Sequence, residues 1–317
     1  MPTQDYSNAS ALLRNTAPRR VVDPSSRPID LITLLQSRGR FVPVAQLGGA
    51  EPYVWSLVTA NNSTAERFTE GQALPGGTRR SFQNPTVGAF YWREVVRVTG
   101  RAQDIARGNG LVDANLLAAE IENASMNMLY LMEQDLKGST VNLGLPSIID
   151  DTALYGGVNP ATYTVHASKV TTSVSTLTAS AMADHYEAQA NAPYNSVATD
   201  ILAAPNQITN YTAIAGLHGG TSVTRTTTPQ AMVGGYDVGI NPAVAAYNGI
   251  PLRMIRGATT TELLWVNVND ITIGVQRDAA YKALADQADD TVGQVSMAAM
   301  VIVENRRLHS KMTGITA

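Results

Sequence analysis

Few residues of this chain have the types and spacing that catalysis needs. His185 lies in the segment ADHYEAQ beside Asp184 and Glu187, and this is the best acid–base group in the sequence. Neighbouring positions on a helix point to different faces, so local geometry does not bring the three side chains together. The sequence therefore favours a solvated or capping role for His185 over catalysis.

Motifs for nucleophilic, phosphate and zinc chemistry are missing from the sequence. No Gly-x-Ser-x-Gly occurs, and KGST at 137–140 has the wrong order for a phosphate loop and follows a predicted helix. The absence of cysteine excludes disulfides, thiolate metal sites and cysteine nucleophiles. The four histidines are far apart in sequence: His166, His185, His218 and His309. We therefore expect no enzymatic activity and no cofactor.

Two pairs of adjacent acids have the residue type that binds divalent cations. Asp150 and Asp151 form the first pair, and Asp289 and Asp290 form the second. Neither pair has the alternating oxygen ligands of a calcium loop. We interpret both pairs as turn and helix-cap residues and expect no metal.

Two arginine pairs are candidates for binding a carboxylate or another anion. Arg79 and Arg80 lie at the turn of a predicted hairpin, where an intersubunit contact and plain solvation are equally open interpretations. Glu70 lies in the same loop and is a further candidate for an intersubunit contact. Arg306 and Arg307 are expected to be solvated at a strand end.

The chain is poor in charge, and its charge is unevenly distributed. Charged residues make up 15% of the 317 residues, below the usual ~25%, so neutral surface is either buried against other copies or rich in Thr, Asn, Gln and Ser. Residues 1–110 hold 13 basic and 8 acidic residues, a net charge of +5, whereas the remainder holds 10 and 18, a net charge of −8. This asymmetry suits a front half that meets a neighbour's back half or nucleic acid, although it also arises by chance.

No targeting or membrane-spanning segment is visible. The N-terminal residues lack a basic patch followed by an apolar core, and the apolar run MAAMVIV at 297–303 is far shorter than the ~18 residues of a membrane span. Aromatic residues are 6% of the chain and do not alternate with a basic stripe, which argues against sequence-specific nucleic-acid recognition. We expect a soluble protein made in the cytoplasm, without membrane contact.

The first half of the chain predicts an arm, a hairpin and a long helix. Residues 1–28 have no sustained periodicity, and DLITLLQ at 30–36 predicts a short helix. PYVWSLVTA at 52–60 and FYWREVVRVT at 90–99 are rich in β-branched and aromatic residues and predict a long projecting hairpin. Apolar residues recur at helical spacing over 112–137, which predicts a strut helix about 39 Å long.

The segment KGSTVNLGLPSIIDD at 137–151 follows this helix and is apolar without carrying chemistry. Gly138 is expected to end the helix, and the leucine and isoleucine residues are expected to fix the chain to the core as a hinge between two lobes. After this segment we expect a helix at 177–190, a strand-to-helix unit from 198 onward and an irregular loop at 216–236. Three strands are expected at 250–256, 263–268 and 271–277, and a last strand at 296–315.

The order of these parts carries a family resemblance. The residues that carry it are RFTEGQALP at 67–75, LMEQDLKG ending the long helix, LGLPSIID at 143–150, AYNGIPLRMI at 246–255 and VENRRLHSKMTGI at 303–315. In this order they resemble the major capsid protein of tailed bacteriophages with the Hong Kong 97 fold, over about residues 30–316. No single motif is specific, and the order of the motifs carries the resemblance.

The resemblance implies an α+β fold of the Hong Kong 97 capsid type. Its parts would be an N-terminal arm at 1–45, an extended β-hairpin loop at 46–98 and a peripheral domain with the spine helix at 99–151. An axial domain would follow at 152–289, and the C-terminal strands at 290–317 would complete the peripheral domain in part.

The same resemblance implies function by assembly. Hexamers and pentamers of the chain would close into an icosahedral shell around double-stranded viral DNA, held by non-specific contact, in a virion capsid assembled in the host cytoplasm. Portal, scaffolding and decoration proteins would be further partners. Some family members join neighbouring subunits by a lysine–asparagine isopeptide bond, but residues 46–98 contain no lysine, so no such cross-link is expected. The short arm after Met1 leads us to expect a separate scaffolding protein.

Three alternatives remain open at the level of sequence. An encapsulin-like compartment would share the fold and enclose a different cargo. A β-rich phage tail or fibre protein would need repeats or a trimeric coiled coil, which the sequence does not show. An enzyme of unknown type is disfavoured because none of the candidate groups above converges.

Overall fold

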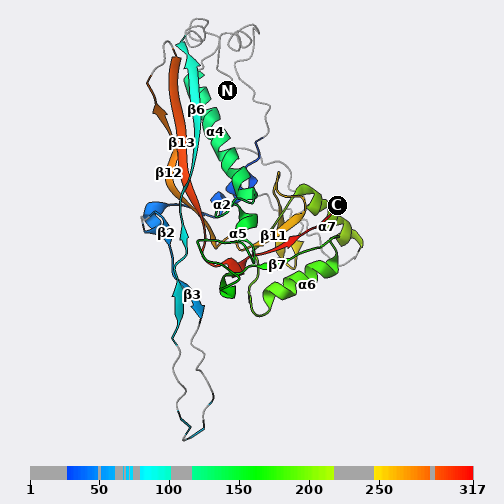
Figure 1. Ribbon diagram of the computed structural model, residues 1–317. Coiled ribbons are helices and arrows are strands. Elements are labelled where there is room, and N and C mark those ends of the chain that lie inside the picture. The colour runs from blue at the N-terminus through cyan, green and yellow to red at the C-terminus, as the bar shows by residue number, and fades with distance from the viewer. Residues whose placement is uncertain are drawn as a thin grey trace.

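The computed structural model describes residues 27–48, 51–60, 67, 69–70, 72–73, 79–100, 116–217, 246–285 and 290–316. Residues 1–26 of the predicted arm and most of the predicted loop at 216–236 lie outside these residues. The described chain forms an elongated molecule in which a long sheet with a helix beside it extends to one side of a compact lobe, and a narrow β-ribbon extends to another (Figure 1).

The long sheet has four strands in the order β1-β12-β13-β6. β13 lies between β12 and β6 and is antiparallel to both, while β1 is parallel to β12. The apolar run MAAMVIV falls within β13 and is buried throughout, because both edges of the strand are paired. The strands are β1 (Phe41–Pro43), β6 (Phe90–Thr99), β12 (Ile271–Ala283) and β13 (Asp290–Val303).

Helix α4 (Leu116–Lys137) packs along one face of this sheet, as Figure 1 shows. The alternation of β6 explains the contact, since Trp92, Val96 and Val98 are buried while the residues between them are more exposed. The indole nitrogen of Trp92 donates to the carboxylate of Asp135 at 2.7 Å, which fixes the register of helix against strand. The predicted strut helix is confirmed over its described part.

A second sheet forms the core of the lobe. Its order is β7-β14-β11-β8-β10-β9, and Trp265 of β11 is completely buried in it beside Met182 of α6. The predicted helix at 177–190 and the strand-to-helix unit are confirmed as α6, β8 and α7. The elements are β7 (Lys169–Thr171), α6 (Ala179–Ala190), β8 (Asp200–Ala203), α7 (Pro205–Leu217), β9 (Ala246–Tyr247), β10 (Ile250–Met254), β11 (Glu262–Val266) and β14 (Ser310–Thr313).

The narrow ribbon corrects the predicted hairpin. Residues 52–60 do not pair with 90–99 but with 81–87, through two short antiparallel pairs. The reason is that β6 uses its edge to bond β13 and buries alternate side chains against α4. The ribbon consists of the pairs β2–β5 and β3–β4, with bounds β2 (Tyr53–Val54), β3 (Leu57–Ala60), β4 (Ser81–Gln83) and β5 (Thr86–Val87).

The predicted last strand is likewise two strands in different sheets. β13 begins at Asp290, before the predicted start, and ends at Val303, after which a short 3-10 helix, η3 (Arg306–Leu308), turns the chain toward β14. The turn falls at the polar residues 304–307, between the apolar run of β13 and the short strand β14. The C-terminal segment therefore connects the long sheet to the lobe.

The predicted short helix at 30–36 is confirmed as α2 (Asp30–Ser37), and a buried carboxylate holds its first turn. Glu133 of α4 accepts from the backbone N–H groups of Leu31 and Ile32, both at 2.8 Å. Lys137 lies 2.7 Å from the same carboxylate and neutralises it. A carboxylate at a helix N-terminus satisfies orphan N–H donors and interacts favourably with the helix dipole.

The remaining short elements connect these parts. They are η1 (Val44–Leu47), α5 (Leu145–Ile148) and η2 (Thr164–His166). Within the described ranges, no helix has the length and apolar content to cross a bilayer.

Gly144, just before α5, lies where the chain crosses its own backbone. A Cβ at this position would lie 1.8 Å from the carbonyl oxygen of Gly138, so the backbone itself would have to move. We predict that Gly144→Ala lowers the free energy of unfolding by about 3 kcal/mol, because the added methyl group would overlap backbone atoms, which cannot rotate away as a flexible side chain can.

Urea denaturation of the purified subunit measures this loss. Gly88→Ala is the matched control, because a Cβ there meets nothing within 4 Å, and we expect its effect to stay within about 0.5 kcal/mol. Equal stability of the two variants would contradict the prediction.

Candidate functional site

The acid–base group around His185 is a core feature. His185 is 1% exposed, and its ring nitrogens lie 2.8 Å from Thr171 Oγ1 and 2.9 Å from Ser310 Oγ. Burial lowers its pKa to about 3, and the positive charge of Lys169 adds to this effect. The predicted solvated or capping role is therefore wrong. Asp184 and Glu187 are exposed on other faces of α6, so no acid–base site forms there.

The adjacent acids hold turns and ion pairs. Asp150 accepts from Thr152 and Ala153 in its own turn and lies 2.5 Å from the Lys311 amine. Burial alone would raise the pKa of Asp150, but the hydrogen bonds from Lys311 and Thr152 outweigh it and hold the pKa well below its usual range. Asp290 pairs with Arg97, and Asp289 lies outside the described residues. In the part of the chain that the structure describes, no three metal-ligating residues come together.

Arg306 is the functional residue that sequence reasoning placed wrongly. It is 0% exposed, and its guanidinium donates to the carbonyl oxygens of Ile148 and Asp150 at 2.6 Å each and to that of Ala153 at 3.1 Å. Its charged group also lies 5.8 Å from the centre of the Tyr155 ring. Burial lowers the pKa of Arg306 to about 10. The expected solvation at a strand end is wrong because η3 turns this side chain inward.

The three carbonyls belong to the apolar segment at 143–155, which we call the joint. Five of its apolar residues are buried to 3% exposure or less, Leu143, Leu145, Ile148, Ile149 and Tyr155, whereas Leu154 is 51% exposed. Lys311 adds a further bond to the carbonyl of Pro146 at 2.8 Å. The joint is thus fixed by two cations from the C-terminal segment, and its backbone carbonyls remain satisfied.

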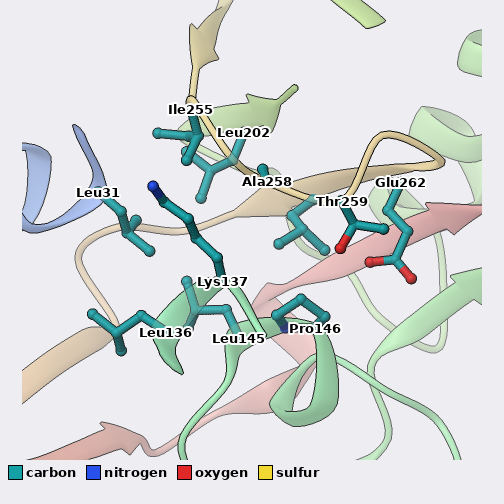
Figure 2. A pocket seen from close by; sticks show the side chains of 11 residues that line it. Leu31, Leu136, Lys137, Leu145, Pro146, Leu202, Ile255, Ala258, Thr259 and Glu262 are labelled. Carbon is teal, nitrogen blue, oxygen red and sulfur yellow. The ribbon is translucent and has the colours of Figure 1, made fainter. Parts of the chain in front are cut away.

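A small cavity lies between the joint, the end of α4, Leu31 of α2 and the sheet of the lobe. Figure 2 shows Leu145 and Pro146 of the joint facing Leu202 and Ile255 of the lobe, with Leu136 from the end of α4 on the other side. The lining is mostly apolar, and its polar residues are Lys137, Thr259 and Glu262. The joint lies against both the lobe and the end of α4 at this cavity, and its role as a hinge stays a prediction.

The candidate contact residues lie on the ribbon. Glu70, Arg79 and Arg80 are all exposed, and none of them makes an ion pair with another described residue. The structure thus does not bring the three together within one chain. Apolar side chains are exposed on the same ribbon, with Val54 at 48% and Phe82 at 55%. Two-stranded ribbons are marginally stable alone in water, so this surface is suited to contact with another molecule.

Comparison with known proteins identifies the fold. No protein-family model and no curated protein sequence matches the chain. The capsid asymmetric unit of cyanophage A-1(L) matches with 15% identity and a TM-score of 0.69, over 97% of this chain and 98% of that chain. A structure from Mycobacterium phage Bobi matches with 13% identity and a TM-score of 0.59, over the full length of both chains.

A cellular shell protein matches as well. The holo-SrpI encapsulin complex from Synechococcus elongatus has 14% identity and a TM-score of 0.56, over 99% of this chain and 96% of that chain. The chain therefore has the fold of phage capsid proteins, which an encapsulin shares. The resemblance drawn from the order of sequence motifs is confirmed at the level of fold.

The role of Arg306 in holding the joint leads to a prediction. Arg306→Met removes the donor to three carbonyls of the joint, in one buried and two partly buried hydrogen bonds, and each unsatisfied buried group costs roughly 1–3 kcal/mol. We expect the free energy of unfolding to fall by about 4 kcal/mol, measured by urea denaturation of the subunit. Arg307→Met is the control, because Arg307 is only partly buried. Comparable losses of unfolding free energy in both variants would contradict the role of Arg306 in holding the joint.

The buried histidines predict loss of stability in acid. Burial, followed by the positive charge of Arg306, lowers the pKa of His166 to about 4. The unfolded chain binds a proton at His166 below about pH 6.5 that the folded chain does not bind, so stability is full above that pH and falls as pH drops toward 4. His185 acts in the same direction.

His166→Phe tests this effect, because phenylalanine keeps a ring beside Tyr155 and does not titrate. Between pH 7 and pH 4.5 we expect the wild type to lose more unfolding free energy than the variant, by on the order of 2 kcal/mol. If the unfolding free energies of the two proteins change with pH in parallel, the predicted contribution of His166 is wrong.

Proposed function

We propose that the chain is a structural protein that self-associates into a closed capsid shell. The observation that carries this proposal is the ribbon β2–β5 and β3–β4, which exposes the apolar side chains of Val54 and Phe82 and in which, among the described residues, β3 and β4 form a sheet of two strands. A protein that keeps such a ribbon needs a neighbour to cover it. The match to capsid proteins over nearly the full length of both chains supports the same conclusion.

The parts of the chain take their proposed roles from this function. Residues 1–45 are an arm, 46–98 an extended loop, 99–151 a peripheral domain completed by part of 290–317, and 152–289 an axial domain. The ribbon of one copy lies on the next copy, which is a heterologous contact, and such contacts close into rings when the rotation permits. Hexamers and pentamers are the rings that an icosahedral shell requires.

The ribbon supplies the contacts between copies through Arg79, Arg80 and Glu70, together with its exposed apolar residues. The proposed role is structural and not catalytic. The contents of the shell are double-stranded DNA held by non-specific contact, with portal and scaffolding or decoration proteins as further partners. Assembly takes place in the cytoplasm of the host, and the mature location is the virion. Lysine is absent from 46–98, so the shell is held together without an isopeptide bond from that loop.

A second candidate function is an encapsulin-like compartment. The match to the encapsulin complex is the observation that favours it, because its coverage and TM-score are close to those of several phage structures. The two functions differ in the contents of the shell: nucleic acid in one case and a cargo protein in the other.

Electron microscopy of the chain, purified from the cells that produce it, tests the proposal. We expect closed particles of uniform size, and we expect double-stranded DNA inside them to resist added nuclease. Protein cargo without nucleic acid would favour the compartment, and a purified chain that stays monomeric under all conditions would refute a shell function.

A further inference from the structure

A polar cavity of about 150 Å³ lies at the root of the ribbon, away from the joint. Tyr53 of β2 forms one wall, and the ends of β12 and β13 form others, so the cavity lies where the ribbon leaves the long sheet. Its lining residues are Arg40, Leu47, Tyr53, Asn269, Asp270, Thr272, Ile302 and Glu304. Glu304 and Asn269 are exposed, which opens the cavity to solvent.

The charged groups of the cavity leave it with an excess of negative charge. Asp270 and Glu304 are carboxylates, and Arg40 is the cation among the lining residues. His309 lies behind Asp270 at 3.0 Å through Nε2. The backbone N–H of Asn267 donates to Nδ1 of His309, so Nε2 is the ring nitrogen that donates to Asp270. Two carboxylates therefore face one guanidinium.

Each carboxylate is held in place through only one oxygen. Glu304 accepts from the Tyr53 hydroxyl at 2.6 Å through Oε1, and Asp270 accepts from His309 and the Asn305 backbone through Oδ2. Among the described residues, nothing donates to the second oxygen of either group. The cavity is thus a positioned pair of acceptors, and a planar guanidinium is the side chain that pairs best with such oxygens.

Cationic side chains of the matching kind are exposed on the ribbon of the same chain. Arg79 and Arg80 directly precede β4 and have no ion pair with described residues. They lie farther along the ribbon than β2 and β5, whereas the cavity lies at its root beside Tyr53. The ribbon of a second copy is therefore the source of a guanidinium that suits the cavity in charge and geometry.

We propose that the cavity formed by Asp270 and Glu304 receives Arg79 or Arg80 from the ribbon of a second copy of this chain. The inference rests on the proposed shell function and names the partner site of the ribbon. The two arginines are adjacent in sequence, and we expect one of them to enter the cavity while the other faces away. Each copy then gives one arginine and receives one, which links the copies head to tail.

The chain has no cysteine, which permits a direct test by disulfide trapping. Glu304→Cys is combined with Arg79→Cys in one variant and with Arg80→Cys in another, and particles are oxidised and run on a non-reducing denaturing gel. We expect one of the two pairs to give a ladder of linked chains that collapses to the monomer with reductant. The control combines Arg79→Cys and Arg80→Cys in turn with Asp184→Cys, an exposed position on α6, and should stay monomeric.

A ladder from neither pair in well-formed particles overturns the inference, and so does an equal ladder from the control. A charge exchange covers the case in which the cysteine variants do not assemble. Glu304→Arg alone should reduce particle yield at least tenfold, and adding Arg79→Glu with Arg80→Glu should restore most of it. Failure of restoration also overturns the inference. A wild-type chain that never forms particles is a separate outcome, which refutes the shell function itself.

Discussion

The burial of one arginine among backbone carbonyls is the constraint on which the rest of the structure depends. The Arg306 guanidinium has three carbonyl partners in the joint and stacks near Tyr155. A buried charge without such partners would cost several kcal/mol, so the joint must keep the path that presents its carbonyls. That path sets how the chain passes from α4 into the lobe.

Two further sets of polar contacts connect the neighbouring parts of the structure, one on the side of the long sheet and one on the side of the lobe. On the side of the long sheet, Glu133 and Lys137 tie α2 to the end of α4. On the side of the lobe, Lys311 ties β14 to Pro146 and Asp150. The carboxylate of Glu133 and the amines of Lys137 and Lys311 are buried and partnered, so removing any one leaves others unsatisfied. The ribbon differs, because it exposes the apolar side chains of Val54 and Phe82.

Much of the fold could be predicted from the sequence where a segment has one strong period. The helix ending at Lys137 and the helix α6 follow from apolar spacing, and Gly138 at the helix end follows from backbone preference. The ribbon was partly predicted, but the pairing partner of residues 52–60 was wrong. Strand pairing depends on which strand edges remain free. β6 pairs with β13, which is about two hundred residues distant in sequence, so residues 52–60 pair with another segment.

By itself the sequence showed no converging group of catalytic residue types, and it predicted that the middle segment belongs in a core and that the parts follow the order seen in capsid proteins. Only the tertiary structure decided the environments of Arg306 and His185, and only it brought Asp270 and Glu304 together at the root of the ribbon. The physical reason is that residue type and spacing report local backbone preference, whereas burial, pairing and charge balance are set by segments that meet after the chain has folded.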